Sequence, residues 1–139
     1  MNPALFASGS DVWETPQAFF NELNNEFHFT LDACALPENA KCKLYFTPET
    51  DGLVQDWCGH TVFVNPPYGR KKALWVEKCY KESLKTNTNV VLLIPARTDT
   101  VYFHRFIYKT AKEIRFVKGR LKFGDSRNSA PFPSMVIIF

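Results

Sequence analysis

The sequence has 139 residues, of which 45% are hydrophobic and 22% charged, as is typical of one compact globular domain. No apolar run is long enough to cross a bilayer, and the opening MNPALFASGSDVWETP lacks the basic-then-apolar pattern of a signal peptide, so we predict a cytoplasmic protein without a membrane partner. The cysteines and histidines have no metal-ligand spacing, so we expect free thiols and no metal site.

The net charge of +3 is divided unevenly along the chain. Residues 1–69 carry two basic and nine acidic side chains, whereas residues 70–139 carry fifteen basic and five acidic ones. A basic half favours a polyanionic partner, and an acidic half favours a cation or a hydroxyl-rich ligand. The alternative is two solvated faces of opposite sign.

The predicted elements of the first half follow an arm at residues 1–11. A helix is predicted over residues 15–27, with Thr15 as its cap and Pro16 in its first position. Short strands are predicted at 29–32 and at the end of 36–46, before a loop at 47–59 and a buried strand at 61–64.

The second half alternates helices and strands. A helix is predicted over 71–86, with its apolar side formed by Ala73, Val76, Tyr80 and Leu84. The run NVVLLIP at 89–95 does not alternate, which indicates a strand covered on both faces. The remaining elements are a helix over 98–113 and strands at 113–117, 119–123 and 134–139. This order predicts an α/β fold with a mostly parallel sheet and helices on both faces.

The stretch NPPY ends the buried strand 61–64, where ligands bind in α/β sheets. The amide oxygen of Asn65 and the carbonyl of Pro66 can accept both hydrogens of a planar amino group, and Tyr68 offers an aromatic face for stacking. The alternative is a structural strand-to-helix turn, because proline and glycine are common turn residues.

This stretch resembles the catalytic motif of the S-adenosylmethionine-dependent amino methyltransferases. WxTP at 13–16, LDACA at 31–35, DGL at 51–53, LLIPART at 92–98 and residues 119–139 further resemble the phage-encoded DNA N6-adenine methyltransferases of the Dam type. The resemblance covers residues 11–139. It implies a Rossmann-like S-adenosylmethionine-dependent methyltransferase fold with an antiparallel C-terminal strand. It also implies one domain over 1–139, without a separate target-recognition domain.

The same resemblance implies direct transfer of a methyl group from S-adenosyl-L-methionine to N6 of adenine, with the base flipped out of duplex DNA and no general base. The catalytic residues would be Asn65, Pro66, Pro67 and Tyr68. The cofactor-binding residues would be Trp13, Thr15, Pro16, Asp32, Ala33, Cys34 and Asp51. DNA would be contacted by Arg70, Lys71, Lys72, Arg97, Arg120, Lys122, Arg127 and Phe132.

Two departures from the family pattern keep alternatives open. The turn LPEN at 36–39 lacks the glycines of the first cofactor loop, and no acid ends the second strand. One alternative is an enzyme acting on RNA or on a protein glutamine, although the basic half argues against a protein substrate. The other is a nucleic-acid-binding relative that has lost the cofactor.

Overall fold

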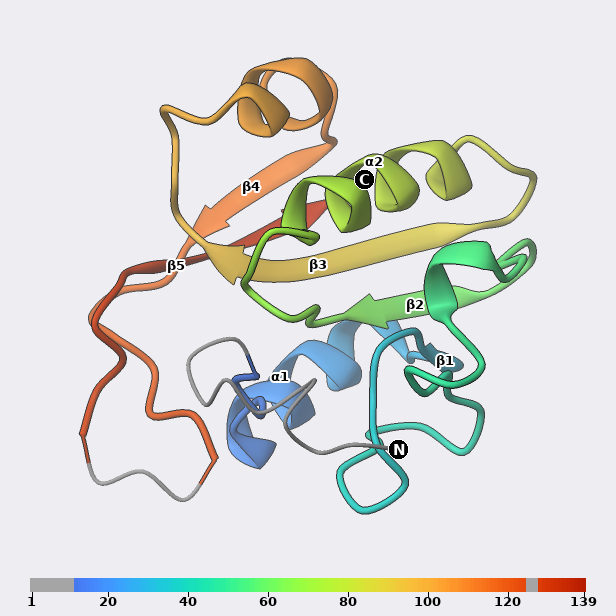
Figure 1. Cartoon of the computed structure of the whole chain (residues 1–139), viewed down its shortest axis with the longest axis horizontal. Coiled ribbons are helices and arrows are strands. Elements are labelled where there is room, and N and C mark those ends of the chain that lie inside the picture. Colours follow the sequence, from blue (N-terminus) through green and yellow to red (C-terminus); the bar gives the residue numbers. More distant parts are fainter. Residues whose placement is uncertain (1–11, 125–127) are drawn as a thin grey trace.

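The computed structural model describes residues 12–124 and 128–139, so the predicted arm at 1–11 and Arg127 lie outside the described residues. Within this part, five strands form one sheet in the order β1-β2-β3-β5-β4 (Figure 1). The strands are β1 (Leu31–Asp32), β2 (Thr61–Val64), β3 (Asn89–Pro95), β4 (Glu113–Phe116) and β5 (Ser134–Ile138). No helix of this part is both long and apolar enough to cross a membrane.

The sheet is mixed rather than mostly parallel. β1, β2 and β3 pair in parallel, but β5 pairs antiparallel with both β3 and β4. The predicted α/β class and antiparallel C-terminal strand are therefore confirmed. The expectation of a mostly parallel sheet is not, because β5 inserts between β3 and β4 and makes two of the four strand pairings antiparallel.

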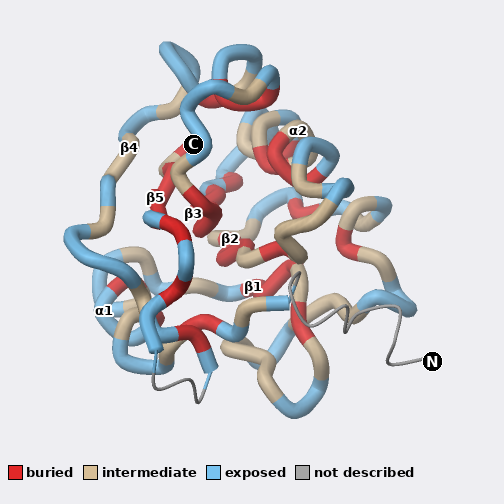
Figure 2. Tube along the Cα trace, turned by 60° about the vertical axis from the view of Figure 1, so that its left-hand side comes forward, coloured by how far each residue is buried: buried red, intermediate tan, exposed pale blue. Residues whose placement is uncertain are grey.

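Both faces of the sheet are covered by helices, as predicted. Along β3, Val90, Leu92 and Ile94 belong to one core cluster, while Val91 and Leu93 belong to the other. The strand is thus buried on both faces, which is why its sequence does not alternate. Figure 2 shows these central strands as the most deeply buried part of the trace.

The two helical layers differ in their packing residues. α1 (Gln17–Phe27) packs Phe20 and Leu23 against the face that includes Phe63. α2 (Lys72–Ser83) and the π-helix η3 (Phe103–Ile107) cover the opposite face (Figure 1). The buried side of α2 is formed by Trp75, Val76 and Cys79, so the predicted apolar side was wrong for Ala73 and Leu84, which are exposed.

Four predicted elements are shorter or absent. The strand predicted at 29–32 is reduced to β1, and the strand predicted after it is a single bridge between Asp32 and Tyr45. The helix predicted over 98–113 is one short helical segment ending in η3. Residues 119–123 form no strand, because their backbone is held elsewhere: Ala130 N–H donates to Leu121, and Gly124 N–H donates to Glu14.

A loop after β1 is pinned against α2 and positions one side of the site. The indole N–H of Trp57 donates to the carbonyl of Gly52 at 3.0 Å, and the backbone N–H of Trp57 donates to buried Glu82 at 2.6 Å. A Cβ on Gly52 would lie 2.2 Å from the carbonyl oxygen of Ala33. Glycine is therefore required for η2 (Gly52–Val54) to approach the end of β1 this closely.

Candidate functional site

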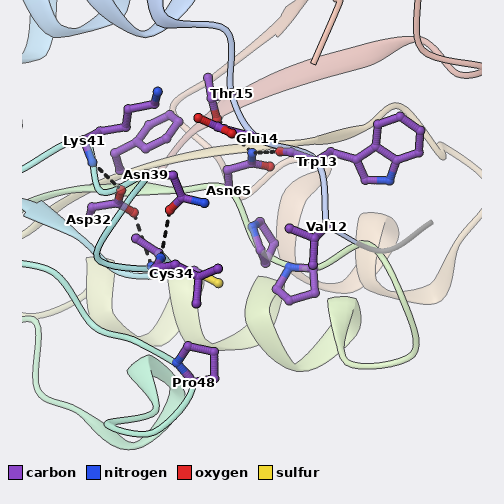
Figure 3. A pocket seen from close by; sticks show the side chains of 15 residues that line it. Val12, Trp13, Glu14, Thr15, Asp32, Cys34, Asn39, Lys41, Pro48 and Asn65 are labelled. Atoms are coloured by element: carbon purple, nitrogen blue, oxygen red, sulfur yellow. Dashed lines mark hydrogen bonds between the residues drawn. The ribbon is translucent and has the colours of Figure 1, made fainter. Parts of the chain in front are cut away.

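Two neighbouring pockets lie beyond the carboxyl ends of β1 and β2. The first has a volume of about 70 Å³ and is lined by Thr15, Asp32 and Asn65 among others (Figure 3). The second has a volume of about 400 Å³, and its lining includes Asp51. Both pockets share Cys34, Pro48 and Pro67, so the two adjoin and form one groove.

The side chain of Asn65 is held by three hydrogen bonds. Its Nδ2 donates to the backbone carbonyl of Trp13 at 2.5 Å and to the Thr15 hydroxyl at 2.8 Å. Its Oδ1 accepts from the Tyr68 hydroxyl at 2.5 Å. The predicted cap role of Thr15 was therefore wrong: Pro16 is the N-cap of α1, and the Thr15 side chain binds Asn65 instead. Pro16 does not line the first pocket.

Four aromatic rings gather beside Asn65. Tyr68 lies edge-on to Phe132, with ring centroids 5.6 Å apart, and to Phe123 at 6.2 Å. The indole of Trp13 packs edge-on against the same two phenylalanines. In Figure 3 the Trp13 ring points away from Asp32, while the backbone of Trp13 faces Asn65. Phe132 is thus buried in a cluster that includes the residue predicted to stack on the base.

Asp32 is a buried carboxylate without an ion pair among the described residues. It is 2% exposed and accepts from the backbone N–H groups of Lys41 at 3.0 Å and Cys34 at 3.3 Å. The ammonium group of Lys41 binds Gln17 instead. Burial raises the pKa of Asp32 from its ordinary 3.8 to about 6, against the lowering effect of those two N–H groups.

Asp51 begins η2 and lines the second pocket, as does Ala33. Its Oδ1 accepts from Leu53 N–H at 3.0 Å, and its φ of 55° is in the left-handed region. It therefore combines a role in the turn before η2 with a position on the groove. The turn at 36–39 is closed by the Asn39 side chain, which accepts from Leu36 N–H where the family pattern has glycines.

The cations predicted to contact DNA differ in their pairing from three lysines in α2 and just after it. Lys78, Lys81 and Lys85 form ion pairs with acidic side chains. In the described part of the chain, no ion pair is found for Arg70, Lys71, Lys72, Arg97, Arg120 or Lys122. Arg70 and Lys71 line the second pocket, so they lie beside the groove.

Known proteins identify the family. The profile described as DNA N-6-adenine-methyltransferase (Dam) matches residues 4–139. The chain belongs to this family. A DNA N-6-adenine-methyltransferase of Haemophilus phage HP1 is 31% identical over 140 residues, covering 95% of this chain and 80% of the relative. One of Escherichia phage T1 is 33% identical over 95 residues, covering 67% of this chain and 39% of the relative.

Membership of the Dam family confirms the resemblance inferred from the motifs and makes this chain a DNA adenine methyltransferase, an enzyme that requires a methyl donor. Two residues at the site were not predicted from the sequence. Phe123 was assigned to a strand, and Lys41, which holds Asp32 through its backbone, carried no signal. The segment FGDSRNSAPF at 123–132 begins and ends with phenylalanine, and this pattern could have indicated that Phe123 lies near Phe132.

Proposed function

We propose that this Dam-family chain methylates N6 of an adenine flipped out of duplex DNA, using S-adenosyl-L-methionine bound in the groove beyond the carboxyl ends of β1 and β2. The observation that carries the proposal is the fixed Asn65 amide, whose oxygen accepts a hydrogen bond at the carboxyl end of β2. Asn65 also lines the first pocket together with Asp32, a buried carboxylate.

The groove has the donor and acceptor set that the cofactor needs. Asp32 lacks a cationic partner in the described part of the chain, and a bound ammonium group would supply one. Asp51 and the wall around Ala33 suit the adenosine end, while Thr15 suits the carboxylate. Bound there, the cofactor supplies an electrophilic methyl group on a sulfonium.

The residues of the chain would orient the amino group rather than remove a proton in advance. Asn65 Oδ1 would accept one hydrogen of the amino group, and the Pro66 carbonyl would accept the other. This leaves the nitrogen lone pair directed at the groove. Pro66 and Pro67 fix two φ angles, which restrains the backbone around the Pro66 carbonyl, while hydrogen bonds hold the Asn65 amide.

The aromatic cluster must open to admit the base. Stacked bases are about 3.4 Å apart, so a base between two parallel rings needs roughly 7 Å. The rings of Tyr68 and Phe132 are edge-on at 5.6 Å, too close for this arrangement. If the base stacks between these two rings, Tyr68 would have to turn and release its hydrogen bond to Asn65.

The cations without ion pairs favour a nucleic acid over a protein glutamine, and the Dam-family match favours DNA over RNA. Arg70 and Lys71 would bind phosphate where α2 begins, since a helix N-terminus also attracts anions. The buried Asp32 argues against a relative that has lost the cofactor, because an unpaired buried carboxylate is costly without a ligand.

The proposal is tested with Asn65→Ala, with exposed Asn21→Ala in α1 as the matched control. We expect the rate of adenine methylation to fall by roughly 10²-fold or more, while calorimetry gives a cofactor Kd within a few-fold of wild type. Methylation by Asn65→Ala within tenfold of wild type would overturn the assignment.

A further inference from the structure

The direction in which the Asn65 amide points is decided by its partners. The two ends of an asparagine amide are nearly the same size, so only hydrogen bonds distinguish the oxygen from the nitrogen. The Trp13 carbonyl, 2.5 Å away, can only accept, so the nitrogen must face it. The oxygen is thereby directed at the Tyr68 hydroxyl.

Thr15 takes the second hydrogen of the same nitrogen. Its Oγ1 lies 2.8 Å from Asn65 Nδ2, and the residue is only 4% exposed. Because Oγ1 accepts from Asn65, its own proton remains available for another acceptor. Among the described residues no acceptor for that proton is found, and Thr15 lines the first pocket.

We propose that Thr15 is a positioning residue for methyl transfer: its hydroxyl oxygen holds the Asn65 amide, and its hydroxyl proton is left for whatever acceptor occupies the pocket. One hydroxyl thus connects the pocket to the amide. A hydrogen bond from the hydroxyl to a pocket ligand also strengthens its oxygen as an acceptor, so occupancy of the pocket tightens the hold on Asn65. This inference rests on the role proposed above for Asn65.

Residues 13–15, before α1, hold the Asn65 amide from a distant part of the chain. Trp13 and Thr15 are about fifty residues from Asn65 in the chain, and Trp13 is also fixed by its ring contacts with Phe123 and Phe132. The amide is therefore held by one backbone carbonyl and one side-chain hydroxyl from a segment that is distant in sequence. Without one of these two hydrogen bonds, the Asn65 amide should adopt a wider range of orientations while staying in the same place.

The experiment compares Thr15→Val, which removes the acceptor at equal size, with Thr15→Ser, which keeps it. Thr88→Val is the matched control, because Thr88 is 5% exposed and its hydroxyl accepts from Gly59 N–H and donates to the Thr86 carbonyl. Three quantities are measured: the single-turnover rate at saturating cofactor and DNA, the cofactor Kd, and hydrogen exchange of the Asn65 side-chain amide by NMR in ¹⁵N-asparagine-labelled protein.

We expect Thr15→Val to lower the saturated rate about tenfold or more and to speed exchange of the Asn65 amide hydrogens in the cofactor-free protein. Thr15→Ser should restore both to within about twofold of wild type. If Thr15→Val does not fold, Thr15→Ala removes the same acceptor and replaces it.

The inference is overturned if Thr15→Val behaves like Thr88→Val in rate and exchange, or if it raises only the cofactor Kd and leaves the saturated rate intact. Either result leaves the proposed function standing so long as Asn65→Ala is inactive. An active Asn65→Ala would instead remove the proposed function, whatever the exchange data give.

Discussion

Replacing Asp32 with asparagine should change the pH dependence of stability in a direction opposite to that of most carboxylates. Burial raises the pKa of Asp32 from 3.8 to about 6 in the folded protein. Between these two values the unfolded chain has lost the proton while the folded protein keeps it. The contribution of Asp32 to stability is therefore greatest below pH 3.8 and is lost as the pH rises through about 6.

The size of the effect follows from the two pKa values. At about 1.36 kcal/mol for each pH unit, ionisation of Asp32 costs the folded protein about 3 kcal/mol. Asparagine does not ionise, so the free energy of unfolding of the wild type minus that of Asp32→Asn should fall by about 3 kcal/mol across this window. The neighbouring thiols do not contribute, because burial raises the pKa of Cys34 to about 12 and of Cys42 to about 11.

Urea unfolding of both proteins from pH 4 to pH 8, followed by fluorescence, measures this difference. Groups that titrate equally in the two proteins, such as Glu82, contribute equally to both free energies of unfolding and cancel in the difference. The same substitution should weaken cofactor binding by about 1.5–3 kcal/mol, since the charge-assisted bond to the ammonium group is removed. A stability difference that stays constant across the pH range would refute the burial argument, and an unchanged cofactor Kd would refute the binding role.

Two further predictions concern DNA. Tyr68→Phe removes the hydroxyl that binds Asn65 and keeps the ring, so we expect a lower KM for DNA, whereas Tyr68→Ala removes stacking worth about 1–3 kcal/mol; equal effects of the two substitutions in steady-state kinetics would contradict this. Replacing Arg70, Lys71 and Lys72 together with alanine should reduce the salt dependence of DNA binding by about 0.9 in log K for each phosphate that is no longer neutralised. Lys81 is exposed and ion-paired, so Lys81→Ala should leave that slope unchanged. If the triple variant keeps the wild-type slope, these three cations do not contact DNA phosphates.

The elements that were predicted correctly are those whose signal is local. β2 and β3 are continuous apolar runs, and α1 has the period of an amphipathic helix, so their burial follows from the sequence. The helical period also located α2, although two of the four residues predicted for its apolar side are exposed. The position of Asn65 at the end of β2 follows in the same way. These features need only a few consecutive residues to be recognised.

The errors come from segments whose partners are distant in sequence. The apolar residues of 119–123 suggested a strand, but Phe123 packs on Trp13 and Tyr68 across the site rather than in the sheet. Thr15 looked like a helix cap because threonine before proline often begins a helix, yet its hydroxyl binds a residue fifty positions away. No local pattern reports such contacts, and both errors occur beside the candidate site.

The two ends of α2 differ in how their charged side chains are paired. Near the C-terminal end of α2, Lys78 and Lys85 form ion pairs with the buried carboxylate of Glu82, which also accepts from the backbone N–H of Trp57. The charge of Glu82 is therefore paired. At the other end of α2, burial and the charge of Arg97 lower the pKa of Lys72. A bound anion would relieve that repulsion, as a bound cation would relieve the cost of ionising Asp32. In the free protein, the charges of Asp32 and Lys72 are therefore both unfavourable. A cationic cofactor would stabilise the first, and an anionic DNA backbone would stabilise the second.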